Sequence, residues 1–255
     1  MLGNRSTSRI GLQLKRALVI AKKDFRIYSL KPPVLISGVL FPLFLFLAFS
    51  IGRKVLPSSL IPGLIGITLF STASSVAPII VPWETRMKTL ERLISTPISI
   101  PAILLGDILA GFAFGVVFSA IPLLLGMIFL GTMLTHPIVL VLGMLLSAFC
   151  FSTFGSLLSA PPTDNPSSVM MLSTLIKFPL IFISGVFIPI DQMPTWGRII
   201  GRLSPLTYFT ELTRYSLQGV RCYPTSLNIT MLLIFIAVFL TADVLFHKKS
   251  LTKRL

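Results

Sequence analysis

Residues 83–96 read WETRMKTLERLIST, a polar stretch between two apolar blocks that are each long enough to cross a bilayer. The stretch holds two of the chain's three glutamates and three of its cations. Because charged side chains are costly in hydrocarbon, this segment must emerge at one face of a membrane. We expect it to form a short helix there that contacts a soluble partner.

The composition places the whole chain among membrane proteins. Of its 255 residues, 54% are apolar and only 12% are charged, and the mean hydropathy is +0.91, far from the balance of a soluble domain. The net charge of +14 comes from cations in short segments beside apolar runs, where they orient the spans. No separate basic domain exists that would bind nucleic acid. The composition therefore predicts an all-α integral membrane protein with no nucleic-acid partner.

Six apolar runs predict six transmembrane helices, since each is close to the ~20 residues that cross a bilayer. They cover residues 34–52, 60–81, 102–130, 138–160, 169–188 and 229–246, and we group residues 34–255 as one transmembrane domain. Fifteen Lys and Arg residues fall in the N-terminal segment, the 83–96 stretch and the C-terminal tail, against six in the loops of the opposite face. The positive-inside rule then predicts that both termini and the 83–96 stretch are cytoplasmic.

Residues 1–33 predict an amphipathic helix that lies in the cytoplasmic membrane interface. Apolar residues recur at steps of three and four from Ile10 to Tyr28, and lysines and arginines fill the opposite face. A cleaved signal peptide does not fit, because the charged region is too long and the first apolar run has the length of a span. A plain membrane anchor and a contact with a partner protein both fit the pattern.

Two ionisable residues fall well inside the predicted spans. Lys177 lies ~13 Å into the fifth span at ~1.5 Å per residue, too deep for its ammonium to reach the headgroups easily. Asp107 lies nearer the cytoplasmic end of the third span. Charge within a membrane marks a substrate pathway or a buried structural pair. Both residues are therefore candidates for the pathway, and the alternative is that Lys177 pairs with Asp107 or with backbone carbonyls.

Small residues at four-residue spacing predict close helix contacts between spans. Gly111 and Gly115 form such a pair in the third span, and a stripe of four residues follows in the fourth: Ala148, Ser152, Ser156 and Ala160. Packing inside one subunit accounts for both patterns. A subunit interface or the lining of a pathway is the alternative.

Residues 189–223 form the second polar block and predict two external helices. Two prolines and the interfacial Trp196 follow the fifth span and turn the chain at the membrane surface. Ser204 and Pro205 then favour the start of a helix, and Gly219 favours its end. Because this block is rich in apolar residues, we expect the helices to dip into the outer leaflet and cover whatever the spans enclose.

These two polar blocks resemble segments of the type-2 ATP-binding-cassette (ABC) exporter permeases, a family that includes drug-resistance permeases and lipooligosaccharide or polysaccharide exporters. The run TLERL at 89–93, followed by STP at 95–97, is similar to the family's coupling helix, which we place at 83–96. The outer segment resembles the family's re-entrant helices before the last span, at Gly185, Pro189, Pro194, Trp196, Pro205, Tyr208 and Arg214. The family tends to carry Gly-Lys where this chain has Gly106-Asp107.

The resemblance implies a transmembrane permease subunit of an exporter in the plasma membrane, without an ATPase of its own. The chain contains no Gly-Lys dipeptide and therefore no phosphate-binding P-loop. ATP and magnesium are expected on a separate ATPase subunit, and a second permease subunit, forming a homodimer, is expected in the membrane lipid. The ATPase contacts implied are Glu84, Lys88, Thr89, Leu90, Glu91, Arg92, Leu93, Thr96 and Pro97, with the leucines as apolar contacts. The chain itself is expected to bind no cofactor and no metal.

Other functions fit parts of the sequence. An integral membrane enzyme acting on a lipid would use Asp164, Asp191 or Glu211. An ion-coupled secondary transporter would need paired intramembrane acids and internal repeats, and the sequence displays neither. His136 and His247 are predicted on opposite faces of the membrane, which argues against a shared metal site. The expected substrate is hydrophobic or amphipathic, and the sequence leaves open a drug, a lipid or a lipid-linked glycan.

Overall fold

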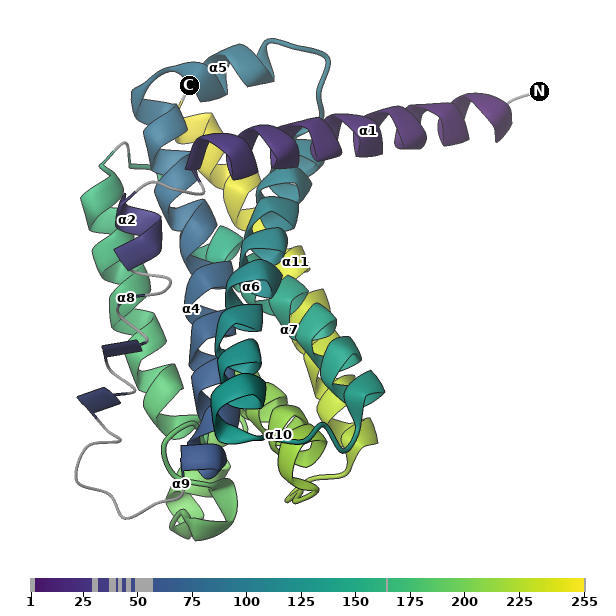
Figure 1. The fold of residues 1–255 in the computed structure, drawn as a ribbon. Coiled ribbons are helices and arrows are strands. Elements are labelled where there is room, and N and C mark those ends of the chain that lie inside the picture. Colours follow the sequence, from purple (N-terminus) through teal and green to yellow (C-terminus); the bar gives the residue numbers. More distant parts are fainter. Residues whose placement is uncertain are drawn as a thin grey trace.

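A computed structural model describes residues 3–28, 32–36, 57–163 and 165–254, with isolated positions 40, 43–44 and 47–48 between them. The regular structure of the described residues is helical, without a strand (Figure 1). The N-terminal helix is α1 (Gly3–Tyr28), and the single turn α2 (Pro32–Leu35) follows. Most of the predicted first span, 34–52, lies outside the described residues. The same holds for Asp164.

Five described helices have the length and hydropathy of membrane spans. They are α4 (Pro57–Arg86), α6 (Ile100–Leu130), α7 (Pro137–Leu158), α8 (Pro166–Ile183) and α11 (Thr225–Arg254). Each matches one of the predicted spans, although α8 ends at Ile183 and not at residue 188. It ends there because the chain turns at Gly185, whose φ of 79° is a left-handed conformation that suits glycine. Figure 1 shows α4 running between α6 and α8.

Close backbone contacts hold α4, α6 and α7 together. A Cβ atom added to Gly111 of α6 would lie 2.3 Å from Ser152 Oγ and 2.8 Å from the Ala73 carbonyl oxygen. A Cβ atom added to Gly155 of α7 would lie 2.5 Å from the Ser74 carbonyl oxygen. The Ser152 hydroxyl donates to the Ile108 carbonyl across the same contact, at 2.6 Å. The small residues of these spans therefore pack against each other within one subunit.

The helix α1 lies across one end of the bundle, beside the short helix α5 (Thr89–Ile94) (Figure 1). Its buried stripe consists of Ala17, Ile20, Asp24 and Tyr28. We expected an apolar stripe facing acyl chains, but the structure presses this side against α6, while Leu14 and Leu18 remain exposed. The end of α11 lies at the same end of the bundle, which we call the α1 end.

The opposite end carries η2 (Ile190–Gln192), α9 (Thr195–Gly201) and α10 (Pro205–Gln218). As predicted, Pro205 is the first residue of α10, and the helix ends at Gly219, whose φ is 71°. The Ser204 hydroxyl does not cap the helix but donates to the Leu180 carbonyl of α8, at 3.3 Å. Contrary to our expectation of a lipid-facing helix, α10 is buried along most of its length among α4, α7 and α11. It is part of the core.

Candidate functional site

The polar stretch 83–96 is divided between two helices. Residues up to Arg86 continue α4, and α5 begins at Thr89. Between them Lys88 adopts a left-handed conformation with φ 55°, the one non-glycine residue of the described chain with positive φ. Such a conformation costs about 1–2 kcal/mol in a residue with a Cβ atom, so the surrounding packing must hold the break. We predicted a single helix over 83–96. In the structure α4 ends at Arg86, the chain turns sharply at Lys88, and the shorter helix α5 follows.

The two faces of α5 differ in what they contact. Leu90 is buried against Ile20 of α1 and Ile103 of α6, and Leu93 packs at the edge of this cluster. The sequence pattern predicted that these leucines would contact the ATPase. In the structure Leu90 is turned inward, and Leu93 is half-buried. Apart from Glu84, the other residues of the predicted contact set are exposed, on α5 or directly beside it: Lys88, Thr89, Glu91, Arg92, Thr96 and Pro97.

Polar contacts from α1 fix the turn that follows α5. The Gln13 side-chain oxygen accepts a hydrogen bond from the Ser99 backbone nitrogen, at 3.1 Å. The Arg16 guanidinium donates to the Pro97 carbonyl. An apolar cavity of about 320 Å³ lies between the two elements, with Val19, Leu93 and Ile98 in its wall. The helix α5 is thus fastened to α1 on one side and to α6 on the other.

A buried cluster of charges lies beneath this contact. The Lys23 ammonium of α1 donates to Glu84 Oε1 of α4 and lies 3.0 Å from Asp24 Oδ1. Glu84 is 3% exposed and Asp107 of α6 is 1% exposed. We call these four residues the ion cluster. The sequence suggested that Glu84 is a surface residue that contacts the ATPase. In the structure its carboxylate is buried and binds Lys23 of the same chain. Asp107 also differs from expectation, because it belongs to this cluster and not to a pair with Lys177.

Two carboxyl groups meet in the ion cluster. Asp24 and Asp107 lie within hydrogen-bonding reach of each other, and oxygens of both find no aligned donor among the described residues. Two carboxyls form a hydrogen bond only when one of them carries a proton. The close approach depends on Gly106, since a Cβ atom there would lie 2.6 Å from Ile20 Cγ2. The sequence did not reveal this pair of acids, whose members are 83 residues apart.

The ion cluster shifts the titration of the α1 residues. Burial raises the pKa of Asp24 to about 6, a shift that Lys23 opposes and Glu84 reinforces. Burial, together with the charges of Glu84 and Asp24, raises the pKa of Tyr28 to about 12. Burial would lower the pKa of Lys23, but the attraction of Asp24 and Glu84 outweighs it and raises that pKa. The site therefore favours a protonated carboxyl beside a charged lysine.

We expect α1 to bind α6 less firmly as the pH rises. The folded pKa of Asp24, about 6, lies above its usual value of 3.8. Its protonation therefore stabilises the folded state fully below pH 3.8, and this contribution is lost as the pH rises through about 6. Amide hydrogen exchange of α1, corrected for intrinsic rates, should accelerate across this window. Asp24→Asn should remove the step, and an unchanged step in that variant would contradict the assignment.

The second internal charge, Lys177 of α8, lies in a cavity of about 210 Å³ between α8 and α4. It is buried, and its ammonium donates to the Ser75 hydroxyl of α4, at 2.9 Å. Ser71, Thr174, Phe178 and other side chains complete the wall. The partner of Lys177 is thus a hydroxyl group, which the sequence did not indicate.

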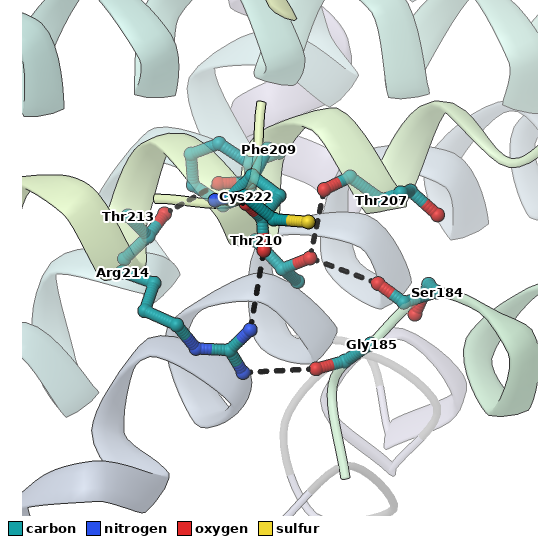
Figure 2. Close-up of polar contacts among 9 residues, drawn as sticks. Ser184, Gly185, Thr207, Phe209, Thr210, Thr213, Arg214 and Cys222 are labelled. Carbon is teal, nitrogen blue, oxygen red and sulfur yellow. Dashed lines mark hydrogen bonds and ion pairs between the residues drawn. The ribbon is translucent and has the colours of Figure 1, made fainter. Parts of the chain in front are cut away.

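The predicted outer residues form a structural network (Figure 2). The Arg214 guanidinium lies 3.3 Å from Glu211 Oε1 and donates to the Gly185 carbonyl at 3.0 Å. Glu211 also accepts from the Cys222 backbone nitrogen, at 2.7 Å. These contacts tie α10 to the turn after α8. Of the remaining predicted residues, Tyr208 donates to the Arg202 carbonyl, whereas Trp196 and Pro194 are exposed.

The two histidines lie at opposite ends of the bundle. The His136 ring stacks on the ring of Tyr215, a residue of α10. His247 lies 3.0 Å from Asp243 Oδ1 within α11, and the Ser156 hydroxyl of α7 donates to the other oxygen of that carboxylate. Asp243 and His247 are both buried. Within the described ranges, no three His, Cys, Asp or Glu side chains gather closely enough to hold a metal ion.

Known proteins with sequences similar to this chain are named as transport permeases. The chain is 22% identical to the inner membrane transport permease YadH of Escherichia coli K12, over 71% of this chain and 70% of that protein. It is 28% identical to ycf38 of Cyanophora paradoxa, named as a putative transport permease, over 93% of this chain and 89% of that protein. YbhS of Escherichia coli K12, named as a probable multidrug ABC transporter permease, is 27% identical over 72% of this chain and 47% of that protein. The family model described as ABC-2 type transporter matches residues 16–217. The chain therefore belongs to the ABC-2 type transporter family and is a membrane-spanning permease of the ABC transporters.

Proposed function

We propose that this permease exports a hydrophobic or amphipathic substrate across the plasma membrane by alternating access, driven by a separate ATPase subunit that binds ATP and magnesium. The substrate is a drug, a lipid or a lipid-linked glycan. Family membership and the names of the relatives support the transport role. In this proposal the α1 end faces the cytoplasm, and two copies of the chain form a homodimer in the lipid bilayer. The chain itself binds no cofactor.

The observation that carries the proposal is the division of α5 into two faces. Its apolar side packs on α1 and α6, and its polar side, with Lys88, Glu91 and Arg92, faces outward. A partner that moves α5 therefore also moves the start of α6 and, through the ion cluster, the end of α4. Because packed helices move as rigid bodies, this displacement reaches the spans. Nucleotide-dependent contacts at α5 would in this way switch the permease between inward-open and outward-open states.

We expect the double variant Glu91→Ala/Arg92→Ala to uncouple the ATPase from transport. Loss of charged contacts that become buried at an interface costs about 2–5 kcal/mol, so substrate-stimulated ATP hydrolysis should fall at least about tenfold. The measurement uses the full chain, copurified with its ATPase and reconstituted in vesicles. The double variant Asp191→Asn/Arg198→Ala at the α9 end serves as a control that leaves coupling unchanged. Full coupling in the α5 variant would rule out this contact surface.

The enzyme hypothesis loses one of its candidate residues to a structural role. Glu211 holds Arg214 and the backbone of Cys222 inside the α10 network, an arrangement that leaves its carboxylate occupied. The secondary-transporter hypothesis required paired acids within the membrane. The structure does bring Asp107 to Asp24, but the second acid belongs to α1 at the end of the bundle. Membership of the ABC-2 family therefore supports an ATP-driven permease over both alternatives.

A further inference from the structure

The cavity at Lys177 combines a buried cation with apolar walls. The Lys177 side chain is 8% exposed, and its ammonium donates to the Ser75 hydroxyl at 2.9 Å. Ser71 and Thr174 add hydroxyl groups, whereas Phe178 and Ile181 make the wall apolar. One turn earlier on the same helix, the hydroxyl of Ser173 is buried without a partner among the described residues. This side of α8 therefore offers hydrogen-bond donors and a positive charge in an apolar setting.

No carboxylate among the described residues reaches this lysine. Of its eight acidic residues, seven are described and all lie in other places: Asp24, Glu84 and Asp107 in the ion cluster, Glu91 on α5, Asp191 in η2, Glu211 beside Arg214, and Asp243 beside His247. Asp164 precedes α8. Lys177 lies about 16 Å beyond Pro166, the first residue of that helix, at ~1.5 Å per residue. The segment 37–56 contains no acidic residue. None of the described residues therefore supplies a counter-charge, and an anionic group of another molecule can do so.

A buried ammonium without a counter-charge is energetically unfavourable, because a single hydroxyl replaces little of its hydration. We infer that this cavity binds the anionic group, a phosphate or a carboxylate, of an amphiphilic substrate, with Lys177 and Ser75 as its polar contacts. This inference rests on the proposed export function and names the substrate class. Cationic amphiphiles are disfavoured at the same place by repulsion from the lysine.

The size and surroundings of the cavity fit a headgroup and not a whole lipid. A volume of about 210 Å³ corresponds to roughly seven water molecules at ~30 Å³ each, enough for a phosphate or carboxylate with a few carbon atoms. The outward face of α8 continues this surface with exposed apolar side chains, among them Met171, Leu175 and Phe182. An alkyl chain attached to the bound anionic group can lie along them. The site thus suits an anionic headgroup with an apolar tail.

Direct binding to the full chain tests this inference without the ATPase. The chain is placed in nanodiscs of phosphatidylcholine and titrated with radiolabelled dodecyl phosphate, and empty discs give the background binding. A parallel titration uses dodecyl trimethylammonium, which has the same alkyl chain length. We expect the wild type to prefer the phosphate, and Lys177→Met to weaken its binding at least about tenfold, as expected for a lost hydrogen bond to a charged group. Lys177→Arg should retain the preference. Lys249→Met, which removes an exposed lysine near the end of α11, should behave as wild type.

A second variant keeps the test decisive if Lys177→Met does not assemble. Ser71→Asp leaves the lysine in place and supplies an internal anion, so it should also abolish binding of dodecyl phosphate. Equal binding of the two probes to the wild type, or unchanged phosphate binding in both variants, overturns the inference. If phosphatidylglycerol in the disc displaces the probe and is not released when the ATPase and ATP are added, the site holds a resident lipid, and the assignment to a substrate is wrong. If the wild-type chain binds dodecyl phosphate as expected but its transport is not coupled to ATP hydrolysis, the proposed export function is refuted and the binding site stands.

Discussion

Replacing Lys23 with methionine should destabilise the protein by about 3 kcal/mol, because it leaves three buried carboxyl groups without their cation. Asp24, Glu84 and Asp107 are all at most 3% exposed. Removing one partner of a buried ion pair costs about 3–5 kcal/mol, and we take the lower end because the Lys23 side chain is 31% exposed. The free energy of unfolding is measured by titrating the purified chain in mixed micelles with a denaturing detergent.

The neighbouring Lys22 provides the control for this variant. It is exposed, so Lys22→Met removes the same charge from the same helix without touching the ion cluster and should change stability by less than about 0.5 kcal/mol. The double variant Lys23→Met/Glu84→Gln removes both partners and should recover part of the loss. Equal effects of Lys22→Met and Lys23→Met would show that the cluster contributes nothing specific to stability.

The sequence was sufficient for five of the six predicted spans and for the limits of α10. Apolar runs predict spans because the bilayer requires a length of apolar helix, and the five described spans agree with that expectation. The ends of α10 followed from local chemistry, since Pro205 and Gly219 act through their own backbone conformations. The ion pair between Glu211 and Arg214 was likewise predictable, because three residues separate neighbours on one helix face.

The ion cluster was not predictable in the same way, because its members come from three helices far apart in the sequence. One signal was nevertheless present. Asp24 falls on the stripe that contains Ala17, Ile20 and Tyr28, where an apolar residue is expected. An acid at a buried helix position needs a partner. Together with Asp107 in a span, it indicated that two buried acids needed partners, although the pattern could not say that Lys23 would pair with Asp24.

The faces of α5 show a further limit of sequence patterns. A motif identifies which residues form a short amphipathic helix. The same residue spacing is compatible with an apolar side that packs on the same chain and with one that packs on a partner protein. Here Leu90 is 8% exposed because α1 covers it. This covering surface is supplied by α1, and the sequence of α5 does not encode it. The last residue of α1, Tyr28, precedes Leu90 by 62 residues. Only the tertiary arrangement shows that Leu90 and Glu84 of the contact set are buried, whereas residues such as Glu91 and Arg92 are exposed.

The contact that brings α1 to α6 depends on Gly106, and this gives the second large expected effect. A Cβ atom at this position would lie 2.6 Å from Ile20 Cγ2, 2.7 Å from Ile20 Cβ and 3.0 Å from the Ala17 carbonyl oxygen. Because one of these atoms belongs to the backbone, α1 as a whole must move away in a Gly106→Val variant. Overpacking costs about 1–3 kcal/mol, which shifts the equilibrium between bound and detached α1 about 5- to 150-fold.

Detachment of α1 is measured at Ala17, which is fully buried in the structure. In an Ala17→Cys background with the exposed Cys222 replaced by serine, Gly106→Val should increase the labelling rate of the introduced thiol by the same factor. It should also reduce transport-linked ATP hydrolysis, because α5 loses one of its two supports. Gly11→Val is the matched control, since a Cβ atom at Gly11 meets no atom within 4 Å. If Gly106→Val labels at the wild-type rate, α1 adapts without leaving α6. If labelling rises while coupling stays intact, α5 drives the spans through α6 and α4 alone, and α1 serves only to anchor the chain.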